Sequence, residues 1–548
     1  MKNKCRFRAL QLLVGLGALL HFSNSAPANV YATNLKLNNS TNNAAVLRGS
    51  SVNIGYILNE VASAGVMLKI LSGTNVVRTI SVAAGNPGTA RGTNLMVWDG
   101  KDDLGSNVVA GAYSFRITAG ANGFDAWTQI SDDNNPGNQV LSPKGIAVNR
   151  NTNSPFYGRV FVGNAPNGTP PSGSEQGIYK HNADGSFAEE GRFSAGGYPW
   201  STGSFRAYSP WKVEVSGDDK VYVNDWADNG IVMAFDPEIK TNNYLNVLRA
   251  DNWPADGLAN LSGPFITGTG TNTQVWMADI NYLNPAPGVG LVRWNVTPDG
   301  TLATNDFGTT IVQARWPSDL NLYPYDMALD KDGHIYTIQY RQTNDTSPRV
   351  LRFPPYDESG TPETHADWKI GGSDSTLVGA SGVAVDPDGT HVAVAVRGLF
   401  NGSIYANGGL QIFEASSGVL ITNISIASNH DHPDVAWDNA GNLYDLDNFD
   451  GRWRVYSPPG TNQATTVALG IAQVFDEYNP PVFLNAAIST NQFQSSLLGQ
   501  PNVTYLIQAS TNLLDWATVS TNYSPNATRI INVSMDTEEC FYRARVNP

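Results

Sequence analysis

Short apolar runs alternate with tight polar turns along most of the chain between residues 142 and 460. One pattern returns there six times: an apolar run, a turn rich in Asp, Asn and Gly, and a second apolar run that ends in polar residues. The six copies lie roughly 52 to 67 residues apart and begin at Ser142, Ser209, Ser262, Tyr323, Ala380 and His432. Such a repeat is typical of radial or stacked architectures, whose units cannot bury their apolar faces alone.

Each repeat holds about four candidate strands, two in the pattern itself and two after it, such as 230–237 and 349–355. Four-stranded antiparallel units arranged around an axis form a β-propeller, which leaves only short, protected strand edges. The sequence therefore predicts an all-β fold with a six-bladed propeller over residues 121–478.

Residues 33–120 form a separate unit before the repeats. Two apolar runs, 66–71 and 76–81, flank the turn residues 72–75, which predicts a β-hairpin. Three further marks follow: Trp98-Asp99-Gly100, a turn at 102–105, and a strand with Gly111, Tyr113 and Phe115. These resemble the Ig-like domain of the flagellar hook-capping protein. The resemblance implies a β-sandwich with Trp98 and Tyr113 in its core.

The pattern changes again at Asn479-Pro480-Pro481, and residues 479–548 form a third unit. A Ser-Thr-Asn-Leu segment before Trp516 and a Phe-Tyr-Arg segment at 541–543 resemble a small C-terminal β domain of secreted proteins from environmental bacteria. The resemblance implies a small β-sandwich, and it carries no chemistry that transfers to this chain.

The first 32 residues have the layout of a secretory signal peptide. Basic residues precede the apolar run 9–20, and small residues follow it. We therefore expect export to the extracellular space, the cell surface or the periplasm, with no transmembrane segment in the mature chain. Loss of this leader moves the net charge from −14 to −18, because it holds four basic and no acidic residues. So negative a chain disfavours nucleic acid as a partner.

The repeat strands resemble those of NHL-type and related six-bladed propellers, including the gluconolactonase-like group. That group binds a metal through one Glu, two Asn and one Asp, and Asn164, Asn224 and Asp279 stand at comparable places here. No acidic residue matches the first ligand. The resemblance implies Ca²⁺ or another divalent metal at these three residues, because such ions prefer oxygen ligands.

A second candidate metal site surrounds His430 and His432. These residues are two apart, so on a strand their side chains would share a face, as metal ligands can. Asp434, Asp445 and Asp447 follow, and histidine together with carboxylates is a ligand set for transition metals. Solvation of loop histidines is the alternative interpretation.

Side chains at the starts of the inner strands of a propeller approach the central channel from several blades. The candidate catalytic residues there, acting as base or ligands, are Asp326, His432 and Asp434, with Lys212 or Arg397 to stabilise an anion.

Flat aromatic rings stand beside these polar groups. Trp211, Trp226 and Tyr325, together with Lys212 and Arg397, are the candidate ligand-binding residues. Sugar C–H faces pack on rings while hydroxyl groups bond to polar side chains, so this combination suits carbohydrate. Filling of the space between blades is the alternative role of each ring.

The leading hypothesis is a secreted binding protein that holds an extracellular glycan, a small molecule or a surface protein on the propeller face. The alternative is a metal-assisted hydrolase, lactonase or polysaccharide lyase acting at the channel mouth. A purely structural surface protein is the third class. The sequence leaves open whether the chain is an enzyme.

Overall fold

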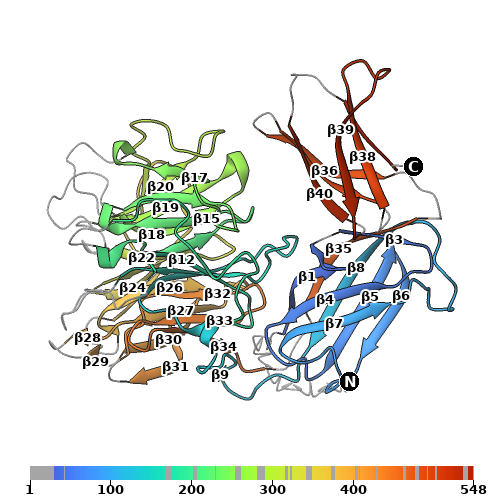
Figure 1. The fold of residues 1–548 in the computed structure, drawn as a ribbon. Coiled ribbons are helices and arrows are strands. Elements are labelled where there is room, and N and C mark those ends of the chain that lie inside the picture. Colours follow the sequence, from blue (N-terminus) through green and yellow to red (C-terminus); the bar gives the residue numbers. More distant parts are fainter. Residues whose placement is uncertain are drawn as a thin grey trace, which may run out of the picture.

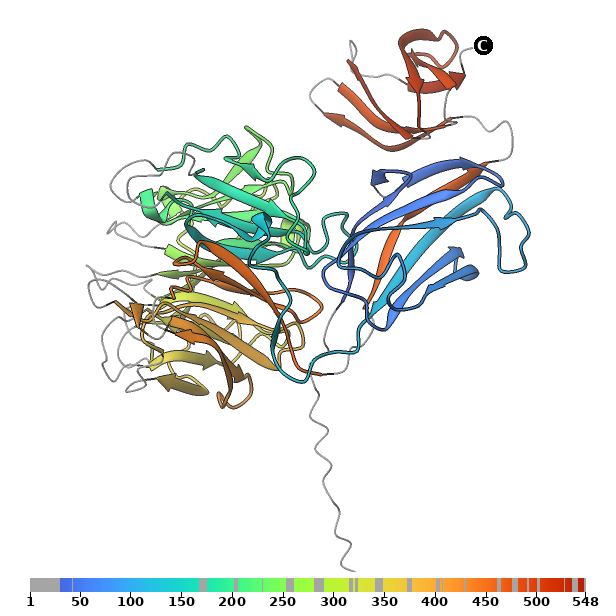
Figure 2. The ribbon, with the colours of Figure 1, turned by 60° about the horizontal axis from the view of Figure 1, so that its bottom comes forward.

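The computed structural model describes residues 30–546 except 42, 167–174, 202–205, 229, 253–260, 280–289, 315–318, 321–323, 341–347, 372–376, 401–404, 407, 428–429, 461–464, 476–480, 490–491, 500–502, 527 and 535–540. Figures 1 and 2 show three β domains: a propeller, a sandwich beside it, and a small C-terminal domain next to the sandwich. The predicted all-β fold is confirmed. Most of the predicted leader lies outside the described residues. Among those described, no helix is long and apolar enough to cross a membrane.

Six four-stranded antiparallel sheets within the described residues form the propeller. Blades one to three are β10 (Pro143–Val148), β11 (Val160–Asn164), β12 (Gly177–His181), β13 (Phe193–Ser194); β14 (Val213–Val215), β15 (Val221–Asp225), β16 (Ile231–Phe235), β17 (Tyr244–Leu248); and β18 (Leu261–Thr267), β19 (Gln274–Asp279), β20 (Gly290–Asn295), β21 (Thr309–Gln313). Blades four to six are β22 (Pro324–Leu329), β23 (Ile335–Gln339), β24 (Pro348–Phe353), β25 (Trp368–Gly371); β26 (Ala380–Val385), β27 (His391–Val396), β30 (Gly408–Glu414), β31 (Leu420–Ala427); and β32 (Val435–Trp437), β33 (Leu443–Asp447), β34 (Arg452–Ser457), β9 (Thr128–Gln129). A small hairpin, β28 (Leu399–Phe400) and β29 (Tyr405–Ala406), extends from blade five.

Burial explains the apolar runs of the repeats. All six residues of β10 are buried, because both faces of a blade pack against neighbouring blades. The polar turns between the first two strands are held by their own side chains. In blade five, for example, one carboxylate oxygen of Asp386 accepts the backbone N–H groups of Thr390 and His391.

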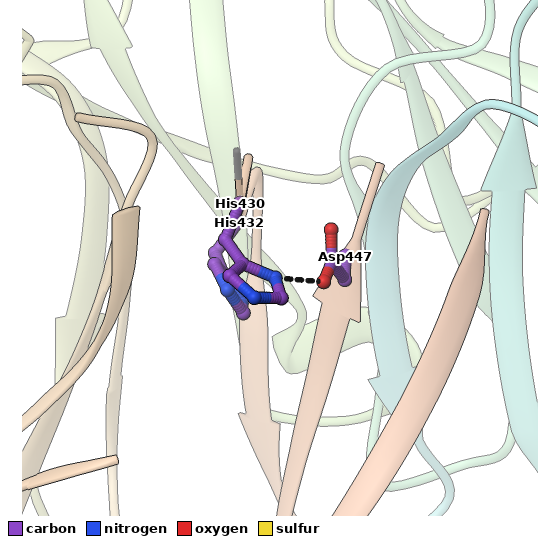
Figure 3. A group of neighbouring side chains, drawn as sticks. All are labelled: His430, His432 and Asp447. Atoms are coloured by element: carbon purple, nitrogen blue, oxygen red, sulfur yellow. Dashed lines mark hydrogen bonds and ion pairs between the residues drawn. The ribbon is translucent and has the colours of Figure 1, made fainter. Parts of the chain in front are cut away.

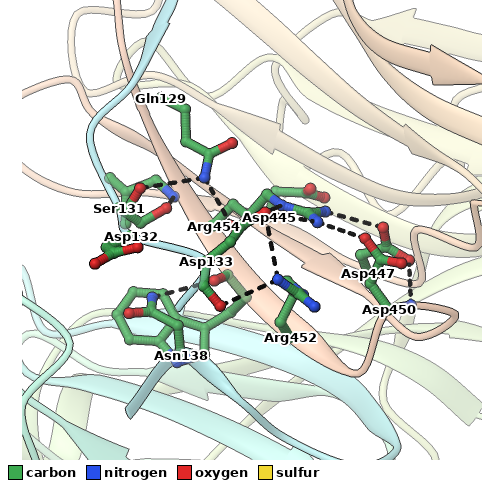
Figure 4. A network of polar contacts seen from close by, with 12 residues as sticks. Gln129, Ser131, Asp132, Asp133, Asn138, Asp445, Asp447, Asp450, Arg452 and Arg454 are labelled. Carbon is green, nitrogen blue, oxygen red and sulfur yellow. Dashed lines mark hydrogen bonds and ion pairs between the residues drawn. The ribbon is translucent and has the colours of Figure 1, made fainter. Parts of the chain in front are cut away.

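Blade six is closed by a strand from the opposite end of the propeller sequence. Its outermost strand is β9, which pairs with β34 at Gln129↔Tyr456 and Thr128↔Ser457. The nearly buried guanidinium of Arg454 lies between three carboxylates, Asp133 beside β9 and Asp447 and Asp450 in blade six (Figure 4). Arg454 therefore fastens the two ends of the ring to each other.

The sandwich contains a strand from beyond the propeller. One sheet has the order β2 (Ser40–Thr41), β1 (Ala32–Leu37), β4 (Val52–Leu58), β7 (Gly92–Trp98); the other has β3 (Asn43–Leu47), β35 (Thr465–Phe475), β8 (Gly111–Gly120), β5 (Gly65–Ser72), β6 (Asn75–Val82). The predicted hairpin is β5 with β6, and Trp98 and Tyr113 are core residues with ring centroids 5.5 Å apart. β35 runs antiparallel to β8 and parallel to β3, and Figure 2 shows it as an orange strand within the blue domain.

This pairing corrects one expected boundary. Residues 465–475 were expected in the propeller, yet Val467, Ala472 and Val474 are buried in the core of the sandwich. The propeller is thus an insertion between β8 and β35. The physical reason is backbone hydrogen bonding: without β35, the N–H and C=O groups along one edge of β8 would have no partner.

The sandwich packs against the underside of blades six and one. The hydroxyl groups of Tyr31 and Tyr444 lie 3.1 Å apart, and the ring of Tyr31 also contacts Tyr157. Glu60 is buried at this junction, and burial raises its pKa to about 7, with a further contribution from the nearby Asp438. The two domains therefore share a packed and partly polar contact.

The C-terminal domain has two three-stranded sheets, β36 (Val482–Ser489), β37 (Gln492–Leu498), β40 (Thr528–Ser534) and β39 (Ala517–Ser524), β38 (Val503–Ser510), β41 (Phe541–Val546). Its own small core contains Phe493, Leu497, Tyr505, Ile507 and Ile531. Leu498 packs with Ala45 and Phe475 of the sandwich, so the two domains touch along a short apolar contact.

Candidate functional site

The candidate site lies on the face of the propeller where the inner strands begin and the second strands end, here called the axial face. Equivalent positions at the starts of the six inner strands alternate between glycine and a charged residue: Gly145, Lys212, Gly263, Asp326, Gly382 and Asp434. A Cβ atom on each glycine would lie within 3 Å of the next blade's charged residue. The glycines therefore make room for the charged residues around the axis.

Lys212 closes the channel. Its ammonium donates to Asp326 at 3.2 Å, to Asp434 at 2.6 Å and to the carbonyl oxygens of Ser381 and Pro433. This cation from blade two is thereby bonded to blades four, five and six. Only 2% of its side chain is exposed, so Lys212 forms a plug and offers no surface to a ligand.

Both carboxylates of the plug also bind backbone. Asp434 accepts the N–H of Ile146 in blade one, and Asp326 accepts the N–H of Val383 in blade five. Ile146 and Val383 each follow one of the alternating glycines. Pro264 follows the third of these glycines, Gly263, and has no N–H to donate. The charged residue of the preceding blade is Lys212, whose ammonium could not accept such a bond, so nothing is lost there.

The charge balance of the plug is one ammonium to two carboxyl groups. Burial raises the pKa of Asp434 to about 7, and burial also raises that of Asp326. Burial acts to lower the pKa of Lys212, but the two carboxyl groups outweigh it and the net shift is upward. The lysine is therefore charged, and its two partners are too closely bound for the expected role of catalytic bases.

A cavity of about 50 Å³ continues along the axis from the plug. Its lining includes Lys212, Asp326 and Asp434 at one end, Glu214 along it, and Arg150 towards the other end. This volume accommodates a few water molecules and no sugar ring. The axis below the plug therefore has no room for a ligand as large as a sugar ring.

Five aromatic rings form a continuous row on that face. Tyr208 contacts Trp211 and Trp226, Trp211 contacts Tyr325, and Tyr325 stacks on Tyr340 with centroids 4.7 Å apart. Trp211 and Tyr325 are 1% and 6% exposed, so they support the row from beneath, and their predicted contact with a ligand stays a prediction. Tyr208, Trp226 and Tyr340 are half-buried and present their rings at the surface.

Polar groups continue the row into blades five, six and one. The guanidinium of Arg397 lies over the ring of Tyr340 and forms a two-pronged ion pair with Asp431, at 2.5 and 2.9 Å. Asn448 donates to Asp431 and accepts from the ammonium of Lys144. Burial and the neighbouring Arg397 lower the pKa of Lys144 to about 8.

Two histidine–carboxylate pairs lie beside this network. His432 Nδ1 is 2.8 and 2.9 Å from the two oxygens of Asp445, and His430 Nδ1 is 2.6 Å from Asp447 (Figure 3). Burial lowers the pKa of His432, but Asp445 and other nearby carboxylates outweigh it, so the net shift is upward. The two histidines lie between β31 and β32 and not on a strand as the prediction assumed, yet their ring centroids are 5.6 Å apart. The ring of His432 bonds to Asp445, whereas Asp326 and Asp434 bond to Lys212. The three expected catalytic residues, Asp326, His432 and Asp434, therefore belong to two separate clusters.

The three residues expected to hold Ca²⁺ are all buried, and Asn164 and Asn224 bond to the backbone. The Asn164 amide oxygen accepts the N–H of Ser142, and the Asn224 amide donates to the carbonyl oxygens of Ile231 and Leu261. Asp279 is buried at the end of β19, opposite Leu261. The Asn224 amide oxygen, the atom that would bind Ca²⁺, has no hydrogen-bond partner among the described residues, so a calcium site at these three residues stays a prediction.

Sequence reasoning missed Tyr208, Asp431 and Asn448. Tyr208 precedes the inner strand of blade two, and Asp431 lies between His430 and His432. Two signals were available. Asp431 belongs to an alternating His-Asp-His segment, and Asn448 follows the Asp-Leu-Asp end of β33. Their pairing with Arg397 and Lys144 depends on contacts between blades, which the sequence does not display.

Comparisons with known proteins leave the family open. No protein-family model matches the chain, and no curated protein matches it. Among solved structures it is similar to a glucose dehydrogenase (9% identity, 44% of this chain and 93% of that chain, TM-score 0.26) and to a glycoside hydrolase (10%, 76% and 97%, 0.27). A family 32 glycoside hydrolase from Bifidobacterium adolescentis is also similar (8%, 91% and 90%, 0.19). Such weak likenesses carry no argument, and the resemblances to NHL-type propellers and the hook-capping protein stay predictions.

Proposed function

We propose that this is an exported binding protein that holds an extracellular glycan on the axial face of its propeller. The observation that carries the proposal is the row of rings that ends in half-buried Tyr208, Trp226 and Tyr340 beside Arg397. Rings at the surface pack against the C–H faces of sugars, and adjacent charged groups bond to hydroxyl or carboxylate substituents.

The outer rings rest on tightly packed residues, and this rigidity favours ligand binding. Trp211 and Tyr325 are packed beneath the outer rings, and the Lys212 plug fixes the strands that carry them. A ring held in place loses little conformational freedom when a ligand arrives, so more of the contact energy appears as affinity. The shallow position above a closed channel suits an extended polysaccharide chain better than a small molecule enclosed in a pocket.

The test is a binding measurement on the full mature chain. Glycan arrays identify a ligand, and titration calorimetry then compares wild type with Trp226→Ala and Tyr340→Ala. We expect each substitution to weaken binding about 10-fold or more, as loss of a stacking ring does at other binding sites. The matched control is Phe307→Ala, an exposed ring in the connection between β20 and β21, at the opposite face of the propeller.

Two results would overturn the proposal. One is the absence of any glycan ligand on arrays that cover neutral and acidic polysaccharides. The other is a ligand whose affinity is the same for wild type, Trp226→Ala and Tyr340→Ala, which would place binding elsewhere on the chain.

The second candidate function, a metal-assisted hydrolase, lactonase or lyase, draws on a different observation. Its reacting groups would be the histidine pairs of blade six, because Asp326 and Asp434 are occupied by Lys212. Release of reducing ends or unsaturated products from a bound polysaccharide would distinguish this activity from binding alone.

A further inference from the structure

His432 is held in an unusual state for a buried side chain. The residue is completely buried, its Nδ1 faces both oxygens of Asp445, and its Nε2 has no hydrogen-bond partner among the described residues. A buried ring nitrogen without a partner is costly, and such atoms in native structures commonly indicate an unplaced ion or water.

Asp445 determines which nitrogen is available. With its Nδ1–H donated to a carboxylate, a neutral imidazole carries its lone pair on Nε2. Metal-binding histidines are held in this way, with the second ring nitrogen bonded to a carboxylate that fixes tautomer and orientation. His432 is therefore oriented as a metal ligand would be.

Two further ligand types lie beside it. One nitrogen each of His430 and His432 and one oxygen of Asp447 lie within 4.8 Å of one another (Figure 3). The second oxygen of Asp447 accepts the backbone N–H groups of Phe449 and Asp450, which hold the carboxylate in place. Side chains from the segment before β32 and from β33 thus converge on one point.

The spacing fits an ion after a small adjustment. Bonds of about 2.0–2.1 Å in a tetrahedral site separate the ligand atoms by about 3.4 Å. The His430–Asp447 contact of 2.6 Å must open to that distance. The His430 side chain is 24% exposed, so its ring has space to turn, and the same exposure gives an ion a route from solvent.

We propose that His430, His432 and Asp447 bind one divalent transition metal ion, with Zn²⁺ the ion best matched to two imidazoles and a carboxylate. Three protein ligands leave a fourth position open on the exposed side of the site. The inference stands independently of glycan binding, and it places a metal at residues other than Asn164, Asn224 and Asp279.

The experiment uses the full mature chain after dialysis against a chelator. Zn²⁺ is titrated in competition with a chromophoric chelator, and Co²⁺ is added separately because its visible absorption reports coordination number. We expect one Zn²⁺ per chain and a four- or five-coordinate Co²⁺ spectrum. His430→Ala should weaken binding about 100-fold or more, since it removes one of three ligands. Asp445→Asn should weaken it about 10–100-fold, because it acts through His432.

The matched control is His391→Ala. His391 Nδ1 lies 2.9 Å from Asp386, a histidine–carboxylate pair in blade five for which the described residues supply no second histidine in a metal-binding group. This variant should bind Zn²⁺ as tightly as wild type. The inference is overturned if the chelator-treated chain binds no Zn²⁺, or if His430→Ala retains one tightly bound ion. Because His430 is partly exposed, circular dichroism of His430→Ala should match wild type, so a loss of binding there cannot be ascribed to unfolding.

Discussion

The ammonium of Lys212 lies 2.6 Å from Asp434 across the axis of the propeller, and both side chains are buried. The same ammonium reaches Asp326, so one cation holds blades two, four and six together. Around it, three glycines in blades one, three and five leave the space that these side chains occupy. The propeller therefore has an approximate threefold arrangement inside its six blades.

Removal of this cation should destabilise the propeller strongly. Lys212→Met leaves two buried carboxyl groups without a counter-ion, and we expect a loss of about 3–5 kcal/mol in the free energy of unfolding. Urea unfolding followed by tryptophan fluorescence measures it. Lys369→Met, which breaks an exposed pair with Asp319, should cost less than about 1 kcal/mol. Equal effects of the two substitutions would refute the structural role of the plug.

The closure of the ring depends on Arg454. Arg454→Met removes the contacts with Asp133, Asp447 and Asp450, so we expect β9 to separate from β34 before the rest of the propeller unfolds. Hydrogen exchange measures this directly: the backbone N–H of Ile130, bonded to Val455 in the native state, should lose protection about 10-fold or more. Protection of blades three and four should be unchanged, and uniform loss throughout the propeller would contradict the prediction.

Glu60 should make the junction between sandwich and propeller sensitive to pH. Its pKa is raised from 4.5 to about 7 by burial and by Asp438, with Arg91 opposing. A carboxyl group whose folded-state pKa is raised stabilises the fold below its unfolded pKa, and this stabilisation is lost as the pH rises through about 7.

Glu60→Gln tests this dependence. The variant should be more stable than wild type at pH 8, by about 1–3 kcal/mol, and similar at pH 4.5. Melting temperatures measured across this range provide the comparison. Glu414→Gln, at an exposed position in blade five, should show no such difference. A pH profile of Glu60→Gln parallel to that of wild type would exclude Glu60 as its source.

His181 should lower the stability of the propeller at acidic pH, whereas Glu60 lowers the stability of the junction at alkaline pH. It is fully buried among Tyr179, Phe187 and Trp453, and burial lowers its pKa from 6.5 to about 3. Its contribution to stability is present above pH 6.5 and is lost as the pH falls towards 3. His181→Phe has no imidazole to protonate. The free energy of unfolding of the variant minus that of wild type should therefore be about 2 kcal/mol higher at pH 5 than at pH 8. His365→Phe, at an exposed site, serves as the control, and equal responses of both variants would count against the prediction.

Much of the fold was accessible from the sequence because its signals are local. Apolar runs separated by Asp-Gly turns identified the six blades, and the hairpin at 66–81 followed from the residues of its turn. The alternation of glycine with Lys212, Asp326 and Asp434 was also present in the sequence, although its meaning depends on which blades are neighbours. The spacing of His430 and His432 drew them together as candidates, but they lie between strands, so only the fold shows that their rings are neighbours.

The tertiary structure decided what depends on contacts between distant segments. β35 joins the sandwich because β8 needs a partner, and β9 closes blade six because a ring leaves two ends to be joined. The tertiary structure also shows that Asp326 and Asp434, which were candidate bases, are ion-pair partners of the buried Lys212. The sequence by itself determined which segments form strands and which residue types stand at their ends. Only the fold determined which of those ends meet, because burial and charge pairing are properties of residues brought together from different blades.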